Sequence, residues 1–237
     1  MVSVDTVYQR VLALANKEQR GYITPQEFNL LANQAQMVIF DQYFYDLEKF
    51  DNDYGNETEY SDMVKTLNEK LSIFKKFDTA LVKNGSFFEY PVDMYKLGTL
   101  YYAPTSLLED GVEIEEIYYD QLLDYYNSPL TKPNKSRPLY IRREEGIRII
   151  SASAINSGVL ATYVRKPDKV NWGYVITLGE PMYNASAAVD FELHPSEETL
   201  LVIKILEMAG ITLNKPGLSQ LAAQEENDMI AQQKIKQ

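Results

Sequence analysis

The sequence predicts an α+β protein with an N-terminal helical bundle, a central antiparallel β region and C-terminal helices. Three observations support this class. Apolar residues first recur at helical spacing, short β-branched and aromatic runs between turn residues follow, and a helix start then introduces a last apolar run. We therefore expect three regions packed as one structural unit: a helical region at 1–84, a β-rich region at 85–193 and C-terminal helices at 194–237.

The helical region is expected to contain three helices, over 4–17, 25–47 and 60–74, because each segment carries an apolar stripe at helical spacing. A turn is expected at 51–56, where Asp, Asn and Gly gather. Its acidic oxygens could in principle hold a cation, but loops of this composition are far more often plain turns.

The connection between the first two helices, Asn16 to Phe28, is similar to the second half of an EF-hand calcium loop. Gly21 stands at the sharp turn, and Glu27 stands where a bidentate carboxylate would close the site. However, Arg20 would occupy a ligand position, and its guanidinium has no acceptor atom for a cation. The better interpretation is a capping box over Thr24 to Glu27, after a helix that ends at Gly21.

The β-rich region alternates short apolar runs with turn signals. Glu144-Glu145-Gly146 is expected to join two of the strands as a hairpin. A short helix is expected over 120–127, followed by an ordered loop over 128–138 whose path is restricted by three prolines. The expected strands cover 87–90, 96–102, 112–118, 139–142, 147–151, 159–165 and 172–178.

A helix is expected to begin near Pro195, with Ser196 as N-cap and acidic residues in its first turn. Its residues are apolar on nearly all sides, which predicts that it is buried, and Ala209-Gly210 is expected to end it. The polar, Gln-rich segment Leu218 to Gln237 is expected to form a helix that is either frayed or docked on a neighbouring subunit.

Composition narrows the possible functions. There is no cysteine, so disulfides, zinc–thiolate sites and thiol catalysis are excluded and a reducing compartment is favoured. The net charge of −11 disfavours tight nucleic-acid binding, although an acidic surface would let DNA pass without sticking. No apolar run is long enough for a transmembrane helix, and Met1 to Asp5 does not read as a signal peptide.

Eighteen tyrosines are many for this length, and some are paired, as in Tyr101-Tyr102, Tyr118-Tyr119 and Tyr125-Tyr126. Tyrosine is enriched in protein interfaces, because it offers a large contact area at a low cost in side-chain entropy. The alternative is that these residues fill strands and the core, and the sequence alone favours neither interpretation.

We find no constellation of residues typical of catalysis, and predict that the protein is not an enzyme and has no catalytic, cofactor-binding or metal-binding residues. The only histidine, His194, has no thiol partner and is interpreted as a structural contact. Carboxylates that are neighbours in sequence diverge on a strand or helix, so Glu115-Glu116 and Glu197-Glu198 are interpreted as solvated faces. The basic pairs Arg142-Arg143 and Arg165-Lys166 are too small for a nucleic-acid footprint, and each could equally pair with an acidic partner surface.

Several segments, taken in their order along the chain, resemble the neck or connector proteins of tailed bacteriophages, including short-tailed phages of the crAss-like group. None of these segments is a chemical signature by itself, and divergent stretches separate them. The resembling segments are Asn16 to Pro25, Glu27 to Asn29, Ala35-Gln36, Ser128 to Leu130, Tyr163 to Pro167, Trp172 to Tyr174, Phe191 to Glu197 and Leu201 to Leu206.

The resemblance implies a virion structural protein without catalytic residues, located in the neck and tail region and assembled in the host cytoplasm. It implies a homo-oligomeric, dodecameric ring between the portal protein and the tail, which continues the DNA channel and docks tail or further ring proteins. Genomic DNA would then be cargo that does not stick, and no membrane would be involved. The sequence also leaves open a degenerate EF-hand-like binding module, or another virion assembly protein such as a tail or head-completion component.

Overall fold

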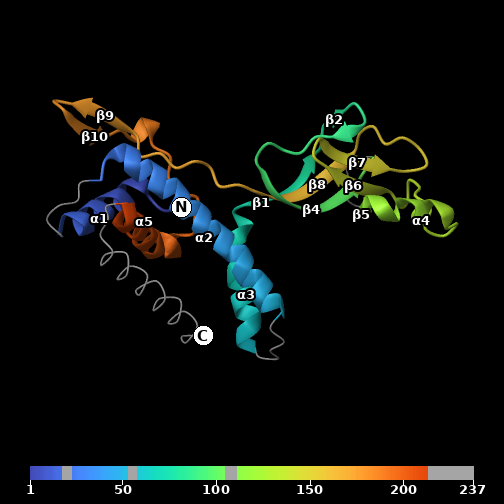
Figure 1. Cartoon of the computed structure of the whole chain (residues 1–237), viewed down its shortest axis with the longest axis horizontal. Coiled ribbons are helices and arrows are strands. Elements are labelled where there is room, and N and C mark those ends of the chain that lie inside the picture. The colour runs from blue at the N-terminus through green and yellow to red at the C-terminus, as the bar shows by residue number, and fades with distance from the viewer. Residues whose placement is uncertain (18–22, 53–57, 105–110, 213–237) are drawn as a thin grey trace. The chain divides into compact units, whose positions relative to one another are not determined.

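The protein is a mixed α+β structure, and a computed structural model describes its residues 1–17, 23–52, 58–104 and 111–212 (Figure 1). The chain divides into two compact units. The helical unit combines Met1–Ile73 with the chain from Pro167 onward, and the β unit is Phe74–Lys166. This division differs from the expected regions 1–84, 85–193 and 194–237, because the two ends of the chain share one unit.

Four helices of the described residues build the helical unit, and the last of them joins the first two into one core. Helix α5 packs against α1 and α2, and α2 packs against α3. As expected from its apolar residues, α5 is buried along most of its length, including Leu201 and Ile205. Within the described ranges, no helix has the length and hydropathy needed to span a lipid bilayer. The helices are α1 (Val4–Lys17), α2 (Pro25–Asn52), α3 (Thr58–Ser72) and α5 (Glu198–Thr212).

The capping box expected at the start of α2 is confirmed. The Thr24 backbone N–H donates to Glu27 Oε2 over 2.9 Å, and the Glu27 N–H donates to Thr24 Oγ1 over 3.3 Å. The bond from the Thr24 backbone holds the pKa of Glu27 below its usual value. Gly21 and Arg20 lie outside the described residues. The helix then continues to Asn52, so the first part of the turn expected at 51–56 is helical.

The start of α5 corrects the expectation that Ser196 is the N-cap. A 3₁₀ turn, η4 (Pro195–Glu197), comes first, and His194 is its cap, with extended backbone at φ −62° and ψ 145°. The Ser196 N–H donates to His194 Nδ1 over 3.3 Å, so Ser196 already lies inside the turn. Helix α5 also continues past Ala209-Gly210 to Thr212. Both residues are buried, and this packing compensates for the roughly 1 kcal/mol helix penalty of glycine.

The β unit contains one eight-stranded sheet in the order β1-β8-β4-β5-β6-β7-β3-β2. The expected hairpin between β6 and β7 is confirmed, with Arg143 opposite Gly146 at its end. Strands β1 and β2 were not expected from the sequence pattern. The strands are β1 (Lys75–Ala80), β2 (Lys83–Asn84), β3 (Phe87–Phe88), β4 (Met94–Tyr102), β5 (Val112–Glu116), β6 (Leu139–Arg143), β7 (Gly146–Ile150) and β8 (Val159–Arg165).

The sheet is curled, and its two edge strands are joined directly by a short connection in the chain. Strands β1 and β2 lie at opposite ends of the strand order, yet only Leu81 and Val82 separate them. The Leu81 N–H donates to Val159 O, and the Glu89 N–H donates to Val82 O, each over 2.9 Å. These two residues thus hydrogen-bond to both sides of the closure. The side chains enclosed by the sheet form the core of the unit: Leu81, Phe88, Leu97, Leu100, Ile114, Tyr140, Ile147, Ile155, Val159, Ala161 and Tyr163.

The β region is not entirely antiparallel, because β5 pairs with β6 in parallel, with Glu115 opposite Leu139. A parallel pair needs a crossover rather than a tight turn. The long 117–138 connection provides it, and contains the 3₁₀ turn η2 (Tyr119–Gln121) and the short helix α4 (Leu122–Asn127), where a helix over 120–127 was expected.

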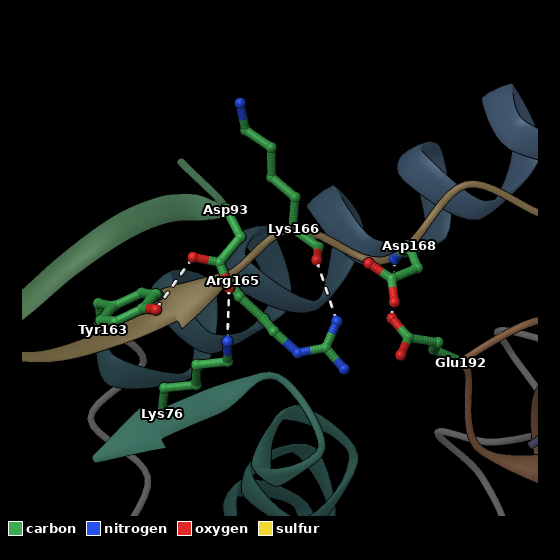
Figure 2. A network of polar contacts seen from close by, with 7 residues as sticks. All are labelled: Lys76, Asp93, Tyr163, Arg165, Lys166, Asp168 and Glu192. Carbon is green, nitrogen blue, oxygen red and sulfur yellow. Dashed lines mark hydrogen bonds and ion pairs between the residues drawn. The ribbon is translucent and has the colours of Figure 1, made fainter. Parts of the chain in front are cut away.

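The carboxylate of Asp93 holds together the place where the chain enters and leaves the β unit (Figure 2). Lys76 Nζ, on β1, lies 2.7 Å from Asp93 Oδ2, and the Tyr163 hydroxyl, on β8, donates to Asp93 Oδ1 over 3.0 Å. The Arg165 N–H donates to Phe74 O over 2.9 Å, so the first and last residues of the unit are also joined directly. Asp93 therefore connects three segments that are distant in sequence.

We predict that Asp93→Asn lowers the melting temperature of the protein at neutral pH by a few degrees. The hydrogen bond from Lys76, the largest cause, holds the pKa of Asp93 below its usual value. The carboxylate thus contributes stability that is complete above its unfolded-state pKa of about 3.9 and is lost as the pH falls through the lowered folded-state pKa. Melting curves between neutral and acid pH should converge for the variant and the wild type. Glu145→Gln, which removes an exposed carboxylate from the β6–β7 turn, is the control; an effect equal to that of Asp93→Asn would contradict this role.

Candidate docking surface

A two-stranded hairpin of β9 (Tyr174–Thr177) and β10 (Glu180–Tyr183) extends beyond the helices of its unit (Figure 1). The strand expected at 172–178 is confirmed in its central part, whereas β10 was not expected. Pro181 explains this omission, because proline cannot donate a ladder hydrogen bond and argues against a strand in a sequence pattern.

Both faces of this hairpin carry apolar side chains. On one face, Tyr174 and Tyr183 pack around Trp172, with ring centroids 5.9 and 5.7 Å from the indole. On the other face, Val175 and Met182 stand opposite each other, and their residues are 52% and 58% exposed. The hairpin is thus anchored at its base and presents an apolar surface to solvent.

The tip of the hairpin combines backbone strain with complete exposure of an apolar side chain. Leu178 has φ 54° and Gly179 has φ 88°, so both central residues of the turn are left-handed. Two-residue turns of this kind favour Asn-Gly or Asp-Gly, and a leucine in this conformation costs roughly 1 kcal/mol or more. Leu178 is 101% exposed, so no burial within the chain offsets this cost. Stability of the isolated chain therefore does not explain the leucine.

Three amide side chains on α2 hold the segment that leads into the hairpin. They lie at i, i+4 and i+7, on one face of the helix, as Asn29, Asn33 and Gln36. Asn33 makes two bonds to one residue: its Nδ2 donates to Val170 O over 2.8 Å, and the Val170 N–H donates to its Oδ1 over 2.9 Å. The Trp172 N–H donates to Asn29 Oδ1 over 2.7 Å. The helix thus satisfies backbone groups that a neighbouring strand would otherwise pair.

Gln36 extends this contact to a third segment of the chain. Its Nε2 donates to Asp168 O over 2.8 Å, and its Oε1 accepts from the Glu192 N–H over 3.3 Å. The buried Glu192 carboxylate in turn accepts from the Asp168 N–H over 2.8 Å (Figure 2). We call the contacts of Asn29, Asn33 and Gln36 with these backbone groups the amide ladder.

Trp172 connects the hairpin to the core of the helical unit. Its indole Nε1–H donates to Asp5 Oδ1 over 2.9 Å, and the ring centroid of Tyr8 lies 4.4 Å from its own. Tyr8 also packs against Phe28, with centroids 4.6 Å apart. Partial burial raises the pKa of Tyr183, which also packs on Trp172, and nearby acidic residues raise it further, so its hydroxyl remains neutral. A continuous aromatic column therefore runs from α2 to the base of the hairpin.

Residues from four of the segments quoted for the phage resemblance meet in the amide ladder. Asn29 and Gln36 come from the first third of the chain, Trp172 from the third quarter and Glu192 from the last. No local pattern in the sequence predicts a role for these side chains. A signal was present, since α2 carries polar amides at helical spacing beside its apolar stripe, but nothing local identifies the backbone that they bind.

The other candidates from the sequence serve structural contacts. His194 Nδ1 lies 2.9 Å from Ser196 Oγ at the start of η4, which agrees with the structural role expected of it. Glu115 and Glu116 are exposed, as expected, and pair with arginines. Glu197 is buried, contrary to expectation, and both Glu197 and Glu198 pair with basic residues of the helices. The ion pairs are Arg137–Glu115 at 3.4 Å, Arg142–Glu116 at 2.6 Å, Lys70–Glu197 at 2.5 Å and Arg10–Glu198 at 2.9 Å.

Neither a metal centre nor a reactive cleft emerges from the described side chains. In those parts of the chain, no group of three or more metal-ligating residues gathers. Glu27, the EF-hand-like ligand, is already bound to Thr24. A cavity of about 470 Å³ is lined by residues of β4, β5 and β6, but Glu115 and Glu116, which line it, belong to the ion pairs above.

The tyrosine pairs divide between the two interpretations that the sequence left open. Tyr101-Tyr102 is half-buried in β4, which agrees with the interpretation that these tyrosines fill a strand. Tyr118-Tyr119 is exposed, and Tyr125-Tyr126 places one ring inward and the other in solvent. The exposed rings lie in the connection around α4.

No protein-family model matches this chain, and no curated protein sequence matches it significantly.

We predict that Asn33→Ala lowers the free energy of unfolding of the helical unit by about 1–3 kcal/mol, because it leaves the N–H and C=O of Val170 without partners. Trp172 is the only tryptophan, so its fluorescence during urea denaturation reports on this unit. Asn68→Ala is the matched control, since that amide bonds a carbonyl of its own helix on the exposed side of α3. Equal losses in the two variants would contradict a special role for the amide ladder.

Proposed function

We propose that this chain is a structural protein of a tailed-bacteriophage virion, which forms a homo-oligomeric ring between the portal and the tail. The resemblance of the ordered segments to connector proteins supports the placement. The observation that carries the assembly role is the β9–β10 hairpin, with exposed apolar side chains on its outer face and a strained, fully exposed leucine at its tip. In this proposal the ring continues the DNA channel and docks tail or further ring proteins.

The energetics of the hairpin favour association. Single exposed apolar residues are ordinary on protein surfaces, but a contiguous group on a projecting element is typical of an interaction site. Full burial of a Val, Leu or Met side chain contributes about 1.5–3 kcal/mol. Burial of Val175, Leu178 and Met182 in a neighbouring molecule would therefore exceed the strain stored at the tip.

The remaining features fit the same role. We infer that the N-terminal helices and α5 act as one bundle, a platform that presents the hairpin, since α5 packs on both α1 and α2. A net charge of −11 suits a ring through which genomic DNA passes without sticking. The ring would be dodecameric, as the resemblance implies, and would join the virion neck after assembly in the host cytoplasm, with no membrane partner and no enzymatic activity.

Two alternative functions were left open by the sequence, an EF-hand-like binding module and another virion assembly protein. A degenerate EF-hand-like module is disfavoured, because the Glu27 carboxylate accepts bonds from both the backbone and the hydroxyl of Thr24. Another virion assembly protein, such as a tail or head-completion component, would use the same docking chemistry. Its position within the virion distinguishes it from a connector.

Electron microscopy and mass photometry of the purified protein, alone and mixed with portal protein, test the proposal. We expect closed rings, or ring formation that depends on the portal, and antibody labelling at the neck of virions. Labelling at the tail tip or within the head would favour a different assembly component. A protein that stays monomeric with the portal and is missing from virions would overturn the proposal.

We predict that Leu178→Asn has opposite effects on folding and on assembly. Asparagine accepts the left-handed conformation, so the free energy of unfolding should rise by about 1 kcal/mol. Ring formation, measured by mass photometry, should weaken because the apolar tip is lost. Val92→Asn is the control, since Val92 is equally exposed but lies in the β unit. A stabilised variant that still assembles normally would show that the tip takes no part in association.

A further inference from the structure

A second exposed apolar surface lies on the β unit, around α4. Tyr119, Leu123 and Tyr126 are spaced i, i+4 and i+7, and they are 62%, 71% and 45% exposed. Their neighbours Leu122 and Tyr125 point the other way and pack against a buried cluster. The outward positions are therefore occupied by large apolar side chains that the unit itself does not cover.

A cation completes this surface. The Arg143 guanidinium lies 5.6 Å from the ring centroid of Tyr119 and 5.8 Å from that of Phe87. Its neighbour Arg142 pairs with Glu116, whereas Arg143 forms no ion pair with any described residue. Ring contacts hold the guanidinium in place, but no carboxylate of the described residues neutralises its charge. We call Tyr119, Leu123, Tyr126 and Arg143 the α4 patch.

The hairpin presents the complementary pattern. Glu180 is its only charged residue, is exposed, and pairs with no cation within the ranges that the structure describes. Its partner across the hairpin is Thr177, and the next pair on the same face is Val175 with Met182. This face therefore offers apolar side chains beside one unpaired carboxylate, and the α4 patch offers apolar side chains beside one unpaired guanidinium.

We propose that the β9–β10 hairpin of one copy docks on the α4 patch of a second copy, with Glu180 meeting Arg143. This inference rests on the homo-oligomer proposed above and names the two surfaces that join its subunits. Aromatic residues, Met and Arg are the side chains enriched at the centres of interfaces. An interfacial charge that loses its water needs a partner of opposite sign, which each surface supplies to the other.

The charges and the stoichiometry favour a second copy of this chain as the partner of both the hairpin and the α4 patch. The two surfaces differ from each other and lie on different units of one chain, so their contact is heterologous, the type that forms a ring when the rotation between subunits closes. In a closed ring every hairpin finds one patch, and no apolar surface of either kind is left over. An unrelated partner would have to match both surfaces separately.

Charge exchange tests the contact. Glu180→Arg and Arg143→Glu should each weaken self-association by about tenfold or more, because like charges meet in the interface. The double variant, Glu180→Arg with Arg143→Glu, should restore association to near the wild-type level. Sedimentation velocity over a dilution series gives the association constants, and circular dichroism checks that each variant folds. Glu145→Arg, two residues after Arg143 in the sequence but outside the α4 patch, is the matched control.

Cysteine pairing gives an independent test, since the chain contains no cysteine that could react instead. Leu178→Cys and Leu123→Cys proteins, mixed and oxidised, should form a disulfide-linked dimer that neither forms alone. Leu178→Cys mixed with Val92→Cys should not, although Val92 is just as exposed. A chain that carries both Leu178→Cys and Leu123→Cys and crosslinks only within itself would overturn docking between copies.

The outcomes separate this inference from the proposed function. If the wild type self-associates but charge exchange has no effect and the cysteines do not link, the hairpin–patch contact is wrong while the ring stands. If the wild type stays monomeric at every concentration and with portal protein, the homo-oligomer is overturned, and this contact with it. If singly reversed variants lose association and the double variant does not recover although it is folded, Glu180 and Arg143 are not partners.

Discussion

The helical unit depends on the contact between α2 and the extended segment at 168–172. Asn171 of this segment pairs with Val189 in a single β-bridge, which leaves backbone groups of Asp168, Val170 and Trp172 to be satisfied by other partners. Asn29, Asn33 and Gln36 bind these groups, one helical turn after another. Buried backbone groups without partners are costly, so this contact decides where the chain returning from the β unit can lie. The position of Trp172, and therefore the base of the hairpin, follows from it.

The β unit solves a related problem by another route. Its edges would be open templates for pairing, but the chain between β1 and β2 connects the two ends of the strand order and hydrogen-bonds on both sides. Asp93 then binds Lys76 and the Tyr163 hydroxyl where the chain enters and leaves. Each unit thus uses side chains to fix backbone that secondary structure alone leaves free.

Two surfaces contain groups that are not satisfied in this way within the chain. Leu178 keeps a strained backbone under an exposed side chain, and Arg143 keeps a charge that its aromatic neighbours do not neutralise. The strained turn does not stabilise the isolated chain, and the ring contacts of Arg143 do not supply an opposite charge, whereas both features become favourable in an interface of opposite charge and shared apolar character. Natural proteins depart from local rules mainly at functional sites, and these departures lie where the proposed assembly needs them.

The sequence by itself determined what short-range chemistry controls. The capping box at Thr24 to Glu27, the stripe of α1 and the hairpin around Gly146 each depend on residues a few positions apart, and the α+β class followed from them. Tertiary structure decided the rest. The parallel pairing of β5 with β6 and the binding of 168–172 by α2 join residues far apart in the chain. His194 became the cap instead of Ser196 because backbone conformation, not side-chain preference, decides where a helix begins. No local pattern records such choices, since their energies arise only when distant segments meet.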